Sequence, residues 1–122
     1  MYMGNIDYLE DVMQVAPLKL VIHDSFAEVG RQVNEYLVKF RKQVNQQHLD
    51  SPAFQGYQTE DFIADCSWPR FGSGEGKAEF HESIRGKDLY VLADVVNHSL
   101  TYPINGFTNH MSPDNIYQDI NV

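Results

Sequence analysis

The sequence predicts an α/β fold in which a small mixed sheet carries helices on its flanks. Two short apolar runs, 18–22 and 89–93, are typical of strands. Between residues 26 and 44, apolar side chains recur at three and four residues, which is the period of a helix. A second helix start lies at Ser112, so strands and helices alternate along the chain.

The length and composition of the chain bound its class. At 122 residues it is long enough for one domain and too short for a second independent core. Its 43% hydrophobic and 21% charged residues are typical of a globular protein. The formal charge of −8 argues against nucleic acid as a partner, because such binding needs clustered Lys and Arg. A nucleotide or sugar phosphate stays compatible, since a few local donors or a metal ion supply the positive field.

The cysteine count and the N-terminus indicate the compartment. Cys66 is the single cysteine, so neither an internal disulfide nor a cysteine-based zinc site is expected. Residues 1–11 carry three acids and no base, unlike a signal peptide, and no apolar run approaches the roughly 20 residues of a membrane span. We therefore expect a cytoplasmic protein without membrane association, in which residues 1–17 form an extended arm or a short turn of helix.

The first strand and the first helix follow this arm. The strand, 18–22, is bounded by Pro17 and by polar residues. Ser25 and Glu28 have the spacing of a capping box, in which each side chain accepts from a backbone amide at the helix start. The apolar stripe of the helix consists of Phe26, Val29, Val33, Tyr36, Leu37, Phe40 and Val44. The residues expected to face water are Arg31, Glu35, Lys39 and Arg41. The polar stretch 43–60 predicts a loop.

Two strands with a tight turn between them are predicted next. Residues 62–68 alternate apolar and polar side chains, which favours a strand ended by the proline that follows. Three glycines in residues 72–76 require a turn, and alternation resumes over 77–81 as the second strand of a hairpin-like pair. After another turn at 85–88, the apolar run 89–93 is typical of a strand covered on both faces.

The C-terminal part predicts a long loop and a helix. Residues 97–111 form a polar stretch too long for a simple connector, so we expect a functional or interface loop. Ser112, Pro113 and Asp114 combine a hydroxyl N-cap, a proline at the first helical position and an acid in the first turn. Because neither a C-cap nor a basic last turn precedes Val122, we expect the natural fold to continue beyond this truncated second helix.

No constellation of residues predicts a catalytic or metal site. Residues 72–77 (GSGEGK) lack the glycine spacing of a phosphate loop and the Ser or Thr after its lysine, so a hairpin turn is favoured. None of the five histidines has a partner at a metal-ligand spacing, and His110, just before the last helix, is the best placed to touch a ligand. Cys66 falls in a strand pattern as a small apolar residue, and no serine lies in a nucleophile elbow.

One part of the chain carries a resemblance to a known family. Residues 70–75 (RFGSGE), Glu79 and residues 82–91 (ESIRGKDLYV) resemble, in order and spacing, the N-terminal signature of the ribose-phosphate pyrophosphokinases, also called PRPP synthetases. Residues 18–42 fall where that family has its first strand and helix. Residues 112–120 resemble the start of a later helix of the family.

The resemblance implies a fold and also an incomplete enzyme. Residues 1–122 would be part of an N-terminal domain with a phosphoribosyltransferase-like fold, in which 43–60 and 97–111 are insertions or loops. The family's metal-binding His, its catalytic loop with Lys and Arg, and its acidic ribose-phosphate loop have no counterpart in this sequence. Since phosphoryl transfer depends on positioned cations, no catalytic or metal-binding residue is expected, and the chain should be inactive alone.

The family reaction transfers the β,γ-diphosphoryl group of ATP to C1 of ribose 5-phosphate with Mg²⁺, in nucleotide biosynthesis. The resemblance implies that Phe71, Ser73 and Glu75 receive the adenine of an ATP bound mainly by a neighbouring subunit, the ring stacking on the purine. Ser73 replaces the commoner Asn or Asp. Ser83 and Arg85 match a regulatory phosphate-binding site of the family, for which the planar fork of an arginine is suited.

Three functions remain open at this point. The chain is the N-terminal fragment of a ribose-phosphate diphosphokinase that supplies adenine-side and interface contacts, or a non-catalytic regulatory or assembly module, or a small nucleotide- or ligand-binding domain. Exposed apolar surface on an unfinished side of the sheet predicts a homo-oligomer or association with a full-length subunit.

Overall fold

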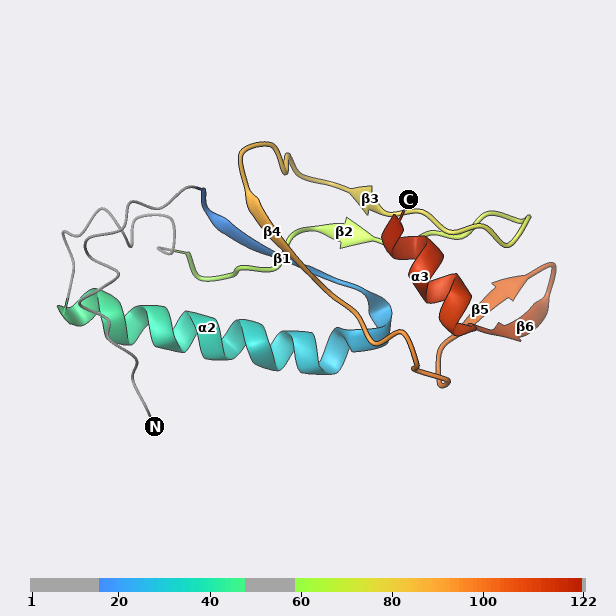
Figure 1. Ribbon diagram of the computed structural model, residues 1–122, viewed down its shortest axis with the longest axis horizontal. Helices are drawn as coiled ribbons and strands as arrows, with labels where there is room; N and C mark the ends of the chain where they lie inside the picture. Colours follow the sequence, from blue (N-terminus) through green and yellow to red (C-terminus); the bar gives the residue numbers. More distant parts are fainter. Residues whose placement is uncertain (1–15, 48–58, 122) are drawn as a thin grey trace.

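A parallel pair of strands lies at the centre of the molecule. The computed structural model describes residues 16–47 and 59–121, which form a small mixed α/β fold with two α-helices and three two-stranded sheets. Strand β1 (Leu18–Ile22) runs parallel to β4 (Asp88–Leu92), with Leu18 opposite Asp88 and Ile22 opposite Leu92 (Figure 1). The predicted α/β class and the strands predicted at 18–22 and 89–93 are therefore confirmed.

A third extended segment lies on the other side of β1. The Leu20 amide donates to the Phe62 carbonyl, and the Ala64 amide donates to the Leu20 carbonyl, each at 2.8 Å. Strand β1 thus has a parallel neighbour on both edges. The side chains of Leu20, Val21, Phe62 and Ala64 are buried there and form the core together with Ile116. Burial of such side chains is the main stabilising contribution to a domain of this size.

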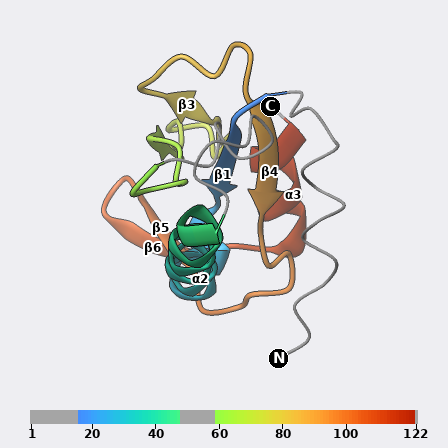
Figure 2. The ribbon, with the colours of Figure 1, turned by 90° about the vertical axis from the view of Figure 1, so that its left-hand side faces the viewer.

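The two α-helices pack on opposite faces of β1. Helix α2 (Ala27–Gln47) follows a short 3-10 turn, η1 (Asp24–Phe26), and lies so close to Ile22 that a Cβ on Gly30 would come within 2.6 Å of that side chain. Residues alternate between the faces of a strand, so His23 points away from α2. His23 bonds to helix α3 (Pro113–Asn121), which therefore covers the second face (Figure 2).

The predicted capping box at the start of the long helix is wrong. The Ser25 amide donates to Nδ1 of His23, so the imidazole caps this helical turn. Glu28 instead accepts from Arg31 and Gln32, and the Arg31 hydrogen bond is the main cause of its lowered pKa. A histidine two residues before Ser25 competes for its backbone donor, which the four-residue capping pattern does not take into account.

Two further features of the helix differ from the expectation. Residues 43–47, which the polar composition assigns to a loop, continue α2, while residues 48–58 of that predicted loop and residues 1–15 of the predicted arm lie outside the described part. The Arg41 side chain, expected to face water, is only 11% exposed and pairs with Glu60. The aliphatic stem of an arginine can cover apolar surface in this way.

The predicted hairpin-like pair is present. Strand β2 (Cys66–Ser67) pairs antiparallel with β3 (Glu79–Phe80), and the pairing continues beyond them as a bridge between Arg70 and Gly76. The hairpin therefore extends from the sheet to a turn at one end of the molecule, where it lies beside strands β5 and β6 (Figure 1).

The stretch 97–111, expected to be a loop, contains a second hairpin. Strand β5 (Thr101–Ile104) pairs with β6 (Phe107–His110), and the two residues between them, Asn105 and Gly106, have φ of 51° and 81°. Positive φ at both positions is characteristic of the tight turns that match the twist of antiparallel strands, and Asn-Gly is the strongest sequence signal for them. Within the stretch 97–111, only residues 97–100 and Met111 connect the hairpin to its neighbouring elements.

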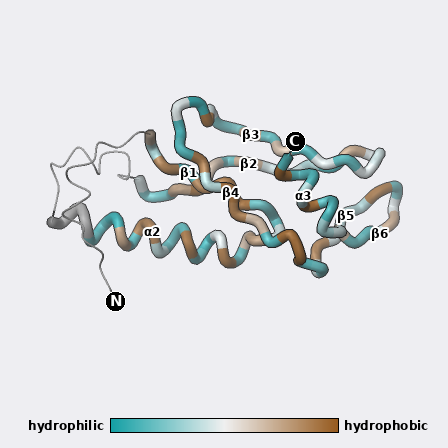
Figure 3. The backbone as a smooth tube through the Cα atoms, in the orientation of Figure 1, coloured by the Kyte–Doolittle hydropathy of each residue, from teal (hydrophilic) through white to brown (hydrophobic). Residues whose placement is uncertain are grey.

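Strand β4 is not covered on both faces as its apolar sequence predicts. Tyr90 is 56% exposed and Val91 is 49% exposed, although these neighbours point to opposite faces. Figure 3 shows hydrophobic residues along this strand as well as along β1. No helix in the described part of the chain is long and apolar enough to cross a membrane.

Candidate functional site

The turn at residues 70–76 brings the three residues predicted to contact adenine together. The Phe71 amide donates to the Glu75 carbonyl at 2.7 Å, and the Gly74 amide donates to the Phe71 carbonyl at 2.9 Å. Gly74 has φ of 93°, a conformation that a residue with a Cβ adopts only at a cost. Phe71, Ser73 and Glu75 are all exposed on this turn. The turn therefore presents an aromatic ring, a hydroxyl and a carboxylate to solvent from one short segment.

A lysine lies against the exposed aromatic ring. Nζ of Lys77 is 5.6 Å from the ring centroid of Phe71, which leaves the ring 52% exposed. Lys77 also pairs with Glu79 at 3.4 Å. A cation beside an aromatic face suits a ligand that combines a flat ring with negative charge.

Arg70 holds this turn from beneath. Its Nη1 donates to the Gly74 carbonyl at 2.6 Å, and its Nη2 donates to both carboxylate oxygens of Asp119 at 2.9 Å. The guanidinium also stacks on Tyr102 of β5, 4.7 Å from the ring centroid. With only 7% of its side chain exposed, Arg70 is a structural residue of the turn rather than part of its solvent-facing surface.

The carboxylate of Asp119 joins this arginine to the end of β1. Its Oδ2 lies 3.0 Å from Nε2 of His23, and both side chains are fully buried. Because Nδ1 of His23 accepts the Ser25 amide, the ring proton is assigned to Nε2, which donates to Asp119. We call Arg70, Asp119 and His23 the buried network; its single carboxylate neutralises its single guanidinium, as burial of charge requires.

The nearby Ser25 does not turn this network into a hydrolase site. Ser25 Oγ is 2.8 Å from Nδ1 of His23, which completes a Ser-His-Asp chain. The serine residue, however, is only 6% exposed, and its hydroxyl already accepts the backbone amide of Asp94. A nucleophile needs access to substrate and an oxyanion position beside it. The ring of Trp68 also packs edge-on against His23, with 4.8 Å between the ring centroids.

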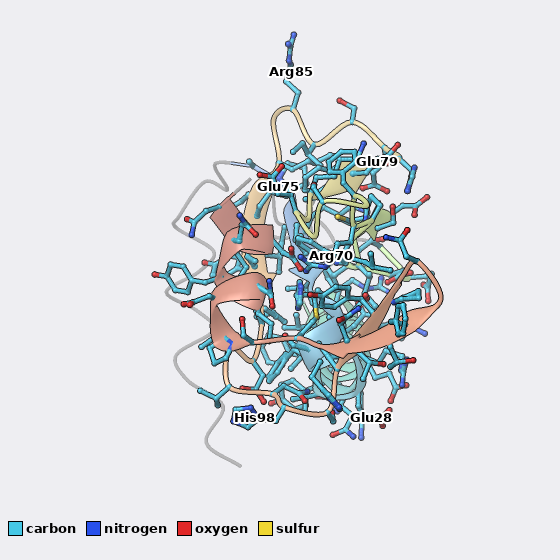
Figure 4. All side chains as sticks on the ribbon, turned by 90° about the vertical axis from the view of Figure 1, so that its right-hand side faces the viewer. Glu28, Arg70, Glu75, Glu79, Arg85 and His98 are labelled. Carbon is cyan, nitrogen blue, oxygen red and sulfur yellow. The ribbon has the colours of Figure 1, made fainter. Side chains whose placement is uncertain are left out.

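The two residues predicted to bind a regulatory phosphate lie in a different place. Ser83 and Arg85 are both exposed in the turn that precedes β4, where Gly86 has φ of 73°. Figure 4 shows Arg85 pointing away from the rest of the protein, well apart from Glu75. The structure thus groups the predicted site residues into two separate turns.

The histidines within the described ranges do not gather into a metal site. His81 bonds to Ser67, and His110 is exposed at the end of β6. Among residues 16–47 and 59–121, no group of three or more His, Cys, Asp or Glu side chains is close enough to hold a metal ion. The prediction that His110 is the histidine best placed to touch a ligand is untested.

Cys66 is expected to react slowly with thiol reagents. Burial raises the pKa of its thiol, and the carboxylates of Asp24 and Asp65 add to the effect. A raised thiol pKa leaves less thiolate at a given pH, so the reaction rate should increase as pH rises towards that pKa. With Ellman's reagent at about pH 8, we expect labelling of the folded chain to be about tenfold slower than labelling of the chain in urea. Equal rates would contradict this.

Comparisons with family models, curated proteins and solved structures found no match. Sequence reasoning missed the buried network. One signal for it exists: Asp119 lies three residues after Ile116, on the inner face of its helix, where an acid requires a buried partner.

Proposed function

We propose that this chain is the adenine-side part of a ribose-phosphate diphosphokinase of the PRPP synthetase type, with a phosphoribosyltransferase-like fold. In that role the 70–76 turn receives the adenine of an ATP held by a second subunit. In this enzyme Mg²⁺ would arrive with the ATP, bound to its phosphate oxygens. The chain alone would bind nucleotide weakly and would not catalyse the transfer.

The geometry of the turn is the observation that carries this proposal. Phe71 offers an exposed ring for stacking on a purine, and the carboxylate of Glu75 can accept from the adenine amino group. Lys77 adds a positive charge beside the ring. The buried Arg70 keeps the backbone in one shape, which reduces the entropy lost when a ligand binds.

The second turn supports a separate anion contact. Ser83 and Arg85 are solvent-exposed and have a hydroxyl donor and a guanidinium within three residues of one another. In the proposed enzyme they would meet a regulatory phosphate. Their distance from the 70–76 turn fits two ligand positions rather than one (Figure 4).

Replacing Phe71 with Ala is expected to weaken binding of AMP to this chain by about tenfold, because stacking of a base on an aromatic ring contributes about 1–3 kcal/mol. Two-dimensional NMR of the labelled chain measures this AMP binding, because AMP should shift the amide signals of residues 71–77 in the wild type. Fold stability should be unchanged, since half of the ring is already exposed.

The matched control is Phe107→Ala, which removes an equally large ring that is 75% exposed on the other hairpin. It should leave the AMP titration unchanged. If AMP does not shift the signals of the 70–76 turn in the wild type, even at concentrations near its solubility limit, the proposed adenine contact is wrong.

A second candidate function, an assembly module, is favoured by the free edge of β4. The Asp88 amide donates to Pro17 and the Leu92 carbonyl accepts from His23, so these residues point towards β1. The main-chain groups of Leu89 and Val91 therefore point the other way. Residues 89–92 of this edge carry no charge, and β4 has no strand partner on that side among the described residues. Such an edge is a template for another strand, and we propose a second copy of this chain as its partner.

Charge selects the register of such a dimer. Two β4 strands related by a two-fold axis pair antiparallel, with the axis at Tyr90 or at Val91. The Val91 register places Asp88 opposite Asp94 of the second copy on both sides of the axis, and like charges opposite one another destabilise a sheet. The Tyr90 register avoids this and pairs the two Tyr90 rings.

In sedimentation equilibrium, the wild type should dimerise, and more strongly at high salt, because each copy carries a formal charge of −8. Tyr90→Lys would place two lysines opposite one another and should weaken the dimer at least about tenfold. Tyr117→Lys, an exposed tyrosine on α3, should not. A wild type that stays monomeric at high concentration and high salt would exclude the assembly module.

A further inference from the structure

We infer that Asp119 is a positioning residue for the 70–76 turn, so that the seating of helix α3 determines how Phe71 and Glu75 are presented to a ligand. The inference rests on the proposed function for the identity of that ligand. The mechanical part of the inference is the coupling between α3 and the turn. It rests on contacts that do not depend on the proposed function.

The first step runs from Asp119 to the backbone of the turn through one guanidinium. Nη2 of Arg70 is fixed by both oxygens of Asp119, and Nη1 of the same group donates to the Gly74 carbonyl. Because a guanidinium is planar, fixing one of its nitrogens also fixes the direction of the other. The position of Gly74 therefore follows the position of the Asp119 carboxylate.

The second step is that Asp119 itself has a single available position. Its carboxylate accepts from Nε2 of His23 at the end of β1, and the residue is 1% exposed. On the side of the turn, a Cβ at Gly76 would come within 1.8 Å of Oδ1 of Asp119. The space between Gly76 and the Asp119 carboxylate therefore has no spare volume. A side chain held on three sides cannot adjust to a displaced helix without releasing Arg70.

The third step is that the conformation of the turn depends on the Gly74 carbonyl, which Arg70 holds in place. The internal hydrogen bonds of the turn, from Phe71 to Glu75 and from Gly74 to Phe71, close only if the Gly74 carbonyl and the residues around it keep this conformation. Phe71 follows Arg70 directly, so a change in the arginine changes where the ring points. Displacement of α3 should therefore weaken a ligand on the turn, and a ligand on the turn should stabilise α3, because such coupling is reciprocal.

Amide hydrogen exchange measured by NMR tests the mechanical part without any ligand. The variant Asp119→Asn keeps the size of the side chain, but it removes the negative charge that pairs with Arg70. It also puts an amide NH₂, a donor, in place of one of the two oxygens that accept from Arg70. The Phe71 and Gly74 amides report on the turn. The Leu20 and Ala64 amides, both hydrogen-bonded in the central sheet, report on the fold as a whole.

In Asp119→Asn, exchange of the two turn amides should accelerate about tenfold more than exchange of the two sheet amides. The control, Asp114→Asn, makes the same substitution at an exposed position of the same helix and should leave this ratio unchanged. Arg70→Lys, which keeps the charge but lacks the planar fork, should reproduce the effect if Asp119→Asn does not fold. An unchanged ratio, or equal acceleration of all four amides, would overturn the positioning role.

An AMP titration of the same samples separates this inference from the proposed function. Binding in the wild type that weakens about tenfold in Asp119→Asn supports both, since Asp119 lies beneath the turn and is itself buried. AMP binding of equal strength in both would overturn the positioning role alone. Absence of AMP binding in the wild type would overturn the adenine contact, while the exchange ratio would still decide the role of Asp119.

Discussion

Replacing Asp119 with Ala is expected to lower the free energy of unfolding by about 4 kcal/mol, because removal of one partner of a buried ion pair leaves the other charge buried and unpaired. Arg70 has only 7% of its side chain exposed, so it cannot turn to solvent without disrupting the hairpin. His23 would lose its acceptor as well. Urea denaturation followed by the fluorescence of Trp68, the only tryptophan, measures the loss.

A double variant and a surface variant make this prediction specific. Arg70→Met combined with Asp119→Leu removes both charges and should be more stable than Asp119→Ala, since apolar pairs of similar volume often replace buried ion pairs without loss. Asp114→Ala, at an exposed position in the first turn of α3, should cost no more than about 1 kcal/mol. A loss below about 1 kcal/mol in Asp119→Ala would show that Arg70 finds another partner.

Gly76→Ala is expected to lower the free energy of unfolding by about 3 kcal/mol, although it adds a single methyl group. The new Cβ would lie 1.8 Å from Oδ1 of Asp119 and 3.2 Å from Nη2 of Arg70. The carboxylate cannot withdraw, because its other oxygen is bonded to His23. The ion pair must therefore separate or α3 must move away, and urea denaturation measures either result.

Gly72→Ala is the matched control, since it lies in the same turn and no atom lies within 4 Å of the position its Cβ would take. Its free energy of unfolding should change by less than about 0.5 kcal/mol. Equal losses in the two variants would mean that flexibility of the turn, rather than the space beside Asp119, decides the cost.

The central elements could be predicted from the sequence because local patterns encode them. The apolar run at 18–22, the helical period that follows it and the Ser112 cap each depend on residues close together in the chain. The cap is present as expected: the Asn115 amide donates to Oγ of Ser112. The hairpin at 101–110 was predictable too, since Asn105-Gly106 lies between its strands, but its few apolar residues concealed it.

The exposure of β4 and the buried network could not be predicted in the same way. An apolar run indicates that a strand prefers to be buried, and it does not indicate which neighbours are present to bury it, so Tyr90 and Val91 differ from the expectation. His23 and Asp119 are 96 residues apart, and Arg70 and Asp119 are 49 residues apart. No spacing rule connects charged residues at such separations; only the packing of α3 on β1 does.

The central position of β1 has a consequence for the order in which the protein folds. One of its edges pairs with residues 62–64 and the other with β4, and His23, which follows it, bonds to α3. All three partners come later in the chain than β1. During synthesis, β1 and α2 therefore leave the ribosome with apolar surface that no later segment yet covers. Contacts this distant in sequence slow folding, and they expose the nascent chain to chaperones and to aggregation until α3 has been made.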